Sequence, residues 1–180
     1  MLSEPQILAL AEPAHRRFVD EMYHLFGLQE HPGYCVAVVK PLISRGGFNY
    51  GKDGHSDRIT INDALTEKEV PNVSYHETSH FLHPFVRMFY KHTRSIPPRN
   101  RTLGEIICVL APLIFLELSE GLGAHRKYFE NTGEPEDHIE RLALDIFQSN
   151  RGVLQEIIHL DMREARKIII PLIRRPLYAR

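Results

Sequence analysis

Apolar residues recur every three or four positions over Ser3–Leu28, which predicts an amphipathic helix with a kink or break at Pro13. Tyr34–Val39 is a continuous β-prone apolar run, and it predicts a buried strand. Arg58–Asn62 alternates polar and apolar residues, so we expect a strand with one face in water. The glycine-rich stretch between the two strands, Pro41–Asp57, is typical of a mobile loop or a loose hairpin.

Helical periodicity dominates the rest of the chain. One helix is predicted from about Pro71 to Tyr90, with a kink or an end near His83 because Pro84 follows it. The other predicted helices are Thr102–Phe129, with a kink at Pro112, then Glu136–Gln148 and Gly152–Ile170. The pattern predicts an α+β fold, mainly helical, with a small sheet early in the chain.

We expect a single domain over residues 1–180, since this length is typical of one domain. Its first part holds the N-terminal helical segment, the sheet and the next helix, to about residue 93. Its second part, from about residue 101, holds the remaining helices. We see no repeat and no composition shift that would divide it.

Composition narrows the classes of protein to consider. Hydrophobic residues make up 43% and charged residues 25%, enough for a packed core. Lys plus Arg number 22 against 23 for Asp plus Glu, which argues against a nucleic-acid binder. No membrane span or signal peptide is expected, and Cys35 and Cys108 stand in apolar runs with no metal or redox spacing. We therefore expect a reduced, cytoplasmic protein, and its 11 histidines direct attention to metal chemistry.

Two of these histidines belong to the motif HETSH at residues 76–80. Four positions on a helix place His76 and His80 on one face, a turn apart, where both imidazoles can bind one metal ion. Glu77 projects beside them and can take a proton from water activated by the metal. We therefore predict one Zn²⁺ per chain, with Glu77 as the catalytic base. The alternatives are a helix with two hydrogen-bonded histidines and a zinc site of purely structural role.

A catalytic zinc site needs a third protein ligand and an open position. We predict Glu120 as the third ligand, because Gly121 and Gly123 beside it would let its helix approach the HETSH helix closely. The alternatives for the third ligand are Glu117, His125 and His83.

The HETSH motif, the strand before it and a glutamate on a later helix resemble the gluzincin class of zinc metallopeptidases. The layout is most similar to the compact minigluzincins and ImmA/IrrE-type proteins. The resemblance implies a small sheet packed over the HExxH helix and a glutamate ligand on the next helix. Gluzincins often carry an aspartate four residues beyond that ligand to orient a zinc-bound histidine; here the position holds Ala124, or Gly121 if Glu117 is the ligand.

The expected activity is that of a zinc-dependent endopeptidase acting on protein or peptide substrates. Tyr128, His125 and Tyr90 are candidates to stabilise the tetrahedral oxyanion. If Arg58–Asn62 is the sheet edge beside the cleft, it can bind an extended peptide by strand addition. A regulatory zinc-binding protein without turnover and a zinc hydrolase acting on a non-peptide amide are the rival interpretations. The apolar run at residues 168–173 leaves a homodimer open.

Overall fold

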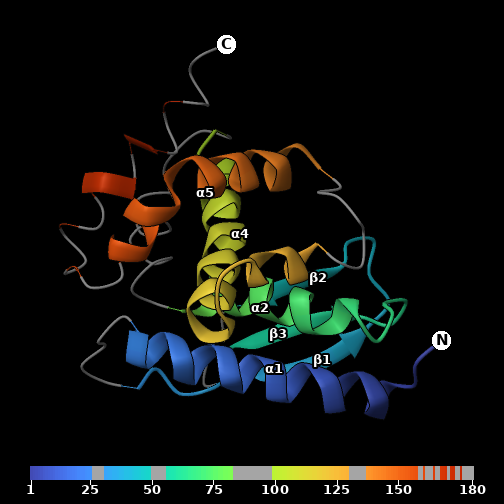
Figure 1. Cartoon of the computed structure of the whole chain (residues 1–180). Helices are drawn as coiled ribbons and strands as arrows, with labels where there is room; N and C mark the ends of the chain where they lie inside the picture. The colour runs from blue at the N-terminus through green and yellow to red at the C-terminus, as the bar shows by residue number, and fades with distance from the viewer. Residues whose placement is uncertain are drawn as a thin grey trace.

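The structure is a computed structural model that describes residues 1–25, 31–49, 56–82, 99–129 and 137–157, with single residues between 160 and 175. Its helices are α1 (Glu4–Leu25), α2 (Glu69–Phe81), α4 (Arg99–Glu120), the 3₁₀ helix η1 (Ala124–Tyr128) and α5 (His138–Ile157). Its strands are β1 (Val36–Lys40), β2 (Gly46–Asn49) and β3 (Arg58–Asn62). Figure 1 shows the mainly helical α+β arrangement with one small sheet, which confirms the predicted fold class.

The three strands form one sheet in the order β1-β3-β2. β1 runs parallel to β3, with Ala37 opposite Ile59, and β2 runs antiparallel to β3, with Phe48 opposite the same Ile59. β2 lies inside the stretch that the glycines predicted to be a loop or loose hairpin, so part of this stretch is a regular strand. The arrangement makes β2 an edge of the sheet.

The prediction that one face of β3 lies in water is wrong. Ile59, Thr60, Ile61 and Asn62 are all buried, because β3 is the central strand and helices cover the sheet. Asn62 is accommodated because its side-chain amide donates to the carbonyl oxygens of Leu42 and Ser44 at 2.9 and 2.7 Å. Its polarity therefore organises the turn before β2 rather than facing water.

The predicted burial of β1 is also wrong for most of its length. Cys35 and Ala37 are buried, whereas Tyr34 is 42% and Val36 47% exposed, and Val38 and Val39 are half-buried. β1 is the other edge of the sheet, so its apolar run is covered only in part.

α2 lies at the centre of the packing. It contacts β2 and β3 of the sheet, and it also packs against α1 and α4. Aromatic rings join the three helices: the ring centroid of Phe18 lies 4.8 Å from that of Phe115 and 5.5 Å from that of Tyr75. α4 in turn packs against η1 and α5.

A buried histidine connects α1, β1 and α2. The Nδ1 atom of His15 lies 2.8 Å from Oγ1 of Thr78, and its Nε2 accepts a hydrogen bond from the backbone N–H of Cys35 at 3.1 Å. Thr78 donates its own hydroxyl proton to Ser74 O, so Nδ1 of His15 must be the protonated nitrogen. The neutral imidazole thus satisfies both of its ring nitrogens inside the core.

The prolines do not end the helices that contain them. α1 continues through Pro13, so the helix does not break there, and α4 continues through Pro112, as predicted. The predicted end of this second helix is corrected. α4 ends at Glu120 rather than Phe129, because Gly121 and Gly123 adopt left-handed conformations with φ of +96° and +92°. A helix cannot continue through such residues.

The interruption predicted between the last two helices is present as a kink. α5 has non-helical backbone at Asn150, where φ is −130°, and it continues from there to Ile157. Most of the rest of the last predicted helix lies outside the described residues. Within the described ranges, no helix combines the length and the apolar character that crossing a membrane requires.

Candidate metal centre

α2 presents the HETSH motif from a well-supported helix. The Glu69 carboxylate accepts hydrogen bonds from the backbone N–H and the hydroxyl of Thr66, at 2.8 and 2.6 Å, and so holds the turn that precedes the helix. Buried Ser74 and Ser79 donate their hydroxyls to the carbonyl oxygens four residues earlier. The helix ends at Phe81 with Leu82 extended, which confirms an end close to the predicted position near His83.

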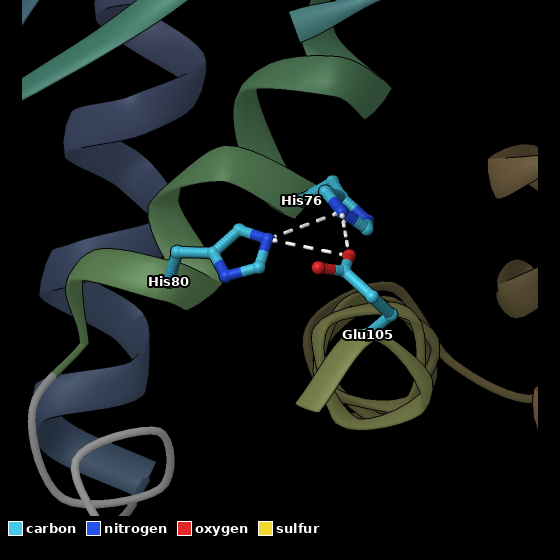
Figure 2. A group of neighbouring side chains, drawn as sticks. All are labelled: His76, His80 and Glu105. Atoms are coloured by element: carbon cyan, nitrogen blue, oxygen red, sulfur yellow. Dashed lines mark hydrogen bonds and ion pairs between the residues drawn. The ribbon is translucent and has the colours of Figure 1, made fainter. Parts of the chain in front are cut away.

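The two motif histidines converge on a carboxylate from α4. Nε2 of His76 lies 3.4 Å from Nε2 of His80, and Oε2 of Glu105 lies 3.4 Å from the first nitrogen and 3.6 Å from the second. Figure 2 shows the imidazoles on successive turns of α2, with Glu105 reaching them from the neighbouring helix. The three donor atoms form a nearly equilateral triangle.

The size of this triangle fits a zinc ion. Donors at about 2.0–2.2 Å from a tetrahedral zinc lie about 3.3–3.6 Å from one another, and all three observed edges have this length. Direct N–H···O hydrogen bonds are shorter, about 2.7–3.2 Å. Two imidazoles and one carboxylate are also a donor set typical of catalytic zinc. The residues present therefore suit a zinc ion.

Each histidine also has a partner for its other ring nitrogen. The hydroxyl oxygen of Tyr128, on η1, lies 3.3 Å from Nδ1 of His76. Sγ of Cys108, on α4, lies 3.3 Å from Nδ1 of His80. Such contacts orient an imidazole so that its Nε2 faces a metal.

Electrostatics keep the third donor ionised. Burial raises the pKa of Glu105, but the close contacts of its carboxylate with the imidazoles of His76 and His80 outweigh burial and hold that pKa well below its usual range. Burial lowers the pKa of His80, yet Cys108 and Glu105 together raise it to about 11. The cluster thus attracts positive charge, which a divalent cation would supply in place of protons.

Glu77 lies beside the cluster with an uncommitted carboxylate. The residue is only 6% exposed, lines the same cavity as the histidines and has no hydrogen-bond partner within the described ranges. Burial raises its pKa above the ordinary value, against the opposing effect of the nearby imidazoles. A carboxylate that borders a cavity without a hydrogen-bond partner is typical of groups that handle protons.

A cavity of about 790 Å³ opens over these side chains. Its walls come from β2, α2, α4, η1 and α5, with apolar surface from Phe48, Val109, Phe129 and Ile139. The ring of Phe48 stacks on His80 at 6.4 Å between centroids and 7° between planes. This volume is large enough for a small-molecule or peptide ligand as well as an ion.

Glu120, the third ligand predicted from the sequence, lies elsewhere. Its carboxylate pairs with Arg17 at 2.8 Å and with Lys127 at 2.7 Å, at the far end of α4. The helix places it about 22 Å along its axis from Glu105. We therefore replace Glu120 by Glu105 in the candidate ligand set.

The glycines after Glu120 also have a different role from the predicted one. They end α4 with left-handed backbone conformations, and no residue packs within 4 Å of where a Cβ would stand on either of them. They do not provide the close helix approach on which the choice of Glu120 depended.

The alternative ligands are likewise not brought to the cluster. Glu117 is buried with His125, whose Nδ1 lies 2.6 Å from its Oε1, and both residues hold the turn after α4. His83 and Tyr90 lie outside the described residues. Of the three predicted oxyanion donors, Tyr128 reaches the cluster and His125 does not.

Sequence reasoning missed Glu105, although a signal was present. Glu105 is the only acidic residue between Arg99 and Leu116, at the entrance to a strongly apolar helix. A lone carboxylate in such a helix needs a buried partner or a cation. The glycines draw attention to Glu117 and Glu120 instead, at the other end of the helix.

No protein-family model matches the sequence, and neither the curated proteins nor the solved structures contain a significant match to the chain. We therefore infer the function from the site itself.

Proposed function

We propose that this protein is a zinc-dependent metallopeptidase whose metal ligands are His76, His80 and Glu105 and whose general base is Glu77. The observation that carries the proposal is the donor triangle with edges of 3.4–3.6 Å, with an unpartnered buried carboxylate beside it.

The chemistry divides between the ion and the chain. A zinc ion, when bound, lowers the pKa of water and polarises a carbonyl oxygen. Glu77 then accepts the proton of the attacking water and donates it to the leaving amine, as base and then as acid. Its raised pKa suits this exchange, because a carboxyl group that titrates closer to neutrality transfers protons in both directions.

A catalytic role is favoured over a structural one by the number of ligands. Structural zinc sites are usually closed by four protein ligands, often cysteines. Within the described ranges, three side chains gather at this site, and Cys108 contacts the far nitrogen of His80 rather than joining the triangle. A zinc ion held by these three side chains would keep one coordination position for water or substrate.

A peptide is the substrate that the cavity wall suits best. β2 is an edge strand, and Ser44–Phe48 line the cavity next to Glu77 and His80. An extended peptide can add to such an edge through backbone hydrogen bonds. The sequence assigned this role to Arg58–Asn62, but β3 is the central strand and has no free edge. We assign the role to β2 instead.

Tyr128 is the remaining candidate to stabilise the oxyanion. Its hydroxyl borders the cavity and can accept the Nδ1 proton of His76 while its own proton is donated towards a substrate oxygen.

The decisive experiment combines zinc content with peptide cleavage. Wild-type protein should contain close to one zinc per chain by elemental mass spectrometry and should cleave members of a peptide library. E77Q should keep its zinc and lose about 10²–10⁴-fold in cleavage rate, because the base is removed and the ligands stay. E105Q should lose zinc, whereas E120Q, the matched control, should retain both zinc and cleavage.

Other results would favour the rival functions. Zinc binding without cleavage of any peptide, and with function unchanged in E77Q, would point to a regulatory zinc-binding protein. Hydrolysis that needs Glu77 but is restricted to non-peptide amides would point to a different zinc hydrolase. Zinc retained in E105Q and lost in E120Q would restore the ligand predicted from the sequence.

A further inference from the structure

Cys108 occupies an unusual place beside the proposed metal centre. It lies one helical turn after Glu105 on α4, so one face of this helix carries both a proposed ligand and the thiol. Its side chain is fully buried, and its Sγ lies 3.3 Å from Nδ1 of His80. The thiol is therefore placed to act on His80 rather than on substrate.

The chemistry of a metal-bound imidazole requires such a partner. When Nε2 binds a metal, Nδ1 carries the remaining ring proton and must donate it. A sulfur atom is a weak hydrogen-bond acceptor, but it can accept the hydrogen bond from Nδ1–H in a site closed to water. The partner of Nδ1 thus decides the tautomer of His80 and the direction in which its Nε2 points.

The carboxylate that often performs this role in the gluzincin pattern is absent from the matching position. Four residues after Glu105 stands Val109, which is buried and apolar. The thiol one position earlier makes the contact with His80. Tyr128 gives His76 a similar neutral partner, so neither of these two contacts brings negative charge to the site.

We propose that Cys108 is the positioning residue for His80. Its sulfur accepts a hydrogen bond from the Nδ1–H group and so fixes Nε2 towards the metal. The inference rests on the proposed metal centre, not on peptide cleavage. A cysteine that merely fills the core would pack equally well without this acceptor, and this difference can be measured.

Two substitutions of similar size separate the acceptor from the packing. C108S keeps an acceptor, and C108V keeps apolar volume without one. The dissociation constant for zinc, measured by competition with a chromophoric chelator, should rise about 10–100-fold in C108V and recover in large part in C108S. The absorption spectrum of the Co²⁺-loaded protein should change in C108V, since it reports the geometry around the ion.

The second buried cysteine provides the control. Cys35 contacts His15, which is not a proposed ligand, so C35V should leave zinc affinity and the Co²⁺ spectrum unchanged. Circular dichroism and urea unfolding of each variant verify that it folds. The inference would be overturned if partial unfolding of C108V accounted for its whole loss of zinc affinity and C108S behaved in the same way.

The remaining outcomes are equally distinct. Wild-type affinity and an unchanged Co²⁺ spectrum in folded C108V would overturn the role of Cys108 while the proposed function stands. A wild-type protein that takes up no zinc would overturn both. Loss of affinity in C108V with recovery in C108S supports the inference whether or not any peptide is cleaved.

Discussion

Gly46 shows how one residue shapes the proposed catalytic arrangement. A Cβ atom at this position would lie 2.7 Å from Oε1 of Glu77 and 2.7 Å from a methyl carbon of Val73. Both distances are far below normal contact, and β-branched Val73 has little rotameric freedom to move away. The absence of a side chain is therefore what lets β2 lie against the face of α2 that carries Glu77.

We predict that G46A forces β2 and α2 apart or turns the Glu77 carboxylate. Overpacking of this kind costs about 1–3 kcal/mol in the free energy of unfolding, measured by urea denaturation. Peptide cleavage should fall with it. G47A is the matched control, because no atom lies within 4 Å of where its Cβ would stand. Equal stability of the two variants would refute the close approach.

At the scale of elements, one buried carboxylate holds α4, η1 and α5 together. Oε1 of Glu117 accepts the backbone N–H of Gly123 at 2.6 Å and contacts Nδ1 of His125 at 2.6 Å, while its Oε2 pairs with Arg151 of α5. The other end of η1 is tied to α2, because the amide of Asn72 donates to the carbonyl oxygen of Tyr128 at 2.9 Å. These contacts set where the Tyr128 hydroxyl stands beside His76.

We predict that E117Q destabilises the protein by on the order of 3 kcal/mol, since it leaves Arg151 without its buried counter-charge. The loss should appear as a lower thermal midpoint. E120Q, on the same helix, removes a carboxylate from more exposed pairs and should cost about 1 kcal/mol or less. If E120Q were the more damaging of the two, the central place of Glu117 would be wrong.

At the scale of the whole molecule, His15 couples the stability of the core to pH. Burial, together with nearby Arg16, lowers the pKa of His15 to about 4. In the unfolded chain a histidine titrates near its ordinary pKa of about 6.5. Below that pH the unfolded chain therefore binds the proton more readily than the folded protein does, and acid favours unfolding.

We predict that this histidine removes about 2 kcal/mol from the free energy of unfolding between pH 8 and pH 5, and about 3 kcal/mol by pH 4. H15Q should be less stable than the wild type at pH 8, but its free energy of unfolding should fall less on acidification. Urea unfolding across the pH range measures both effects. H24Q changes an exposed histidine and should follow the wild-type curve. Parallel curves for H15Q and wild type would show that His15 does not titrate as described.

The local features of this protein can be predicted from its residue pattern. His76 and His80 share a helix face because the period of an α-helix places residues four apart together, whatever surrounds them. Most of the helices and two of the strands follow from periodicity in the same way. Gly46, Gly121 and Gly123 were visible as glycines, but their roles depend on neighbours and backbone conformation that no local pattern contains.

The tertiary structure alone decided the rest. Glu105 meets the histidines only because α4 packs on α2, and several glutamates on that helix satisfy the local rules equally well. β3 is the central strand and β2 is an edge strand, because strand order depends on pairing between distant segments. A metal site forms where side chains meet in space. Periodicity therefore predicts candidate ligands that share one helix, whereas a candidate ligand from a second helix depends on how the helices pack.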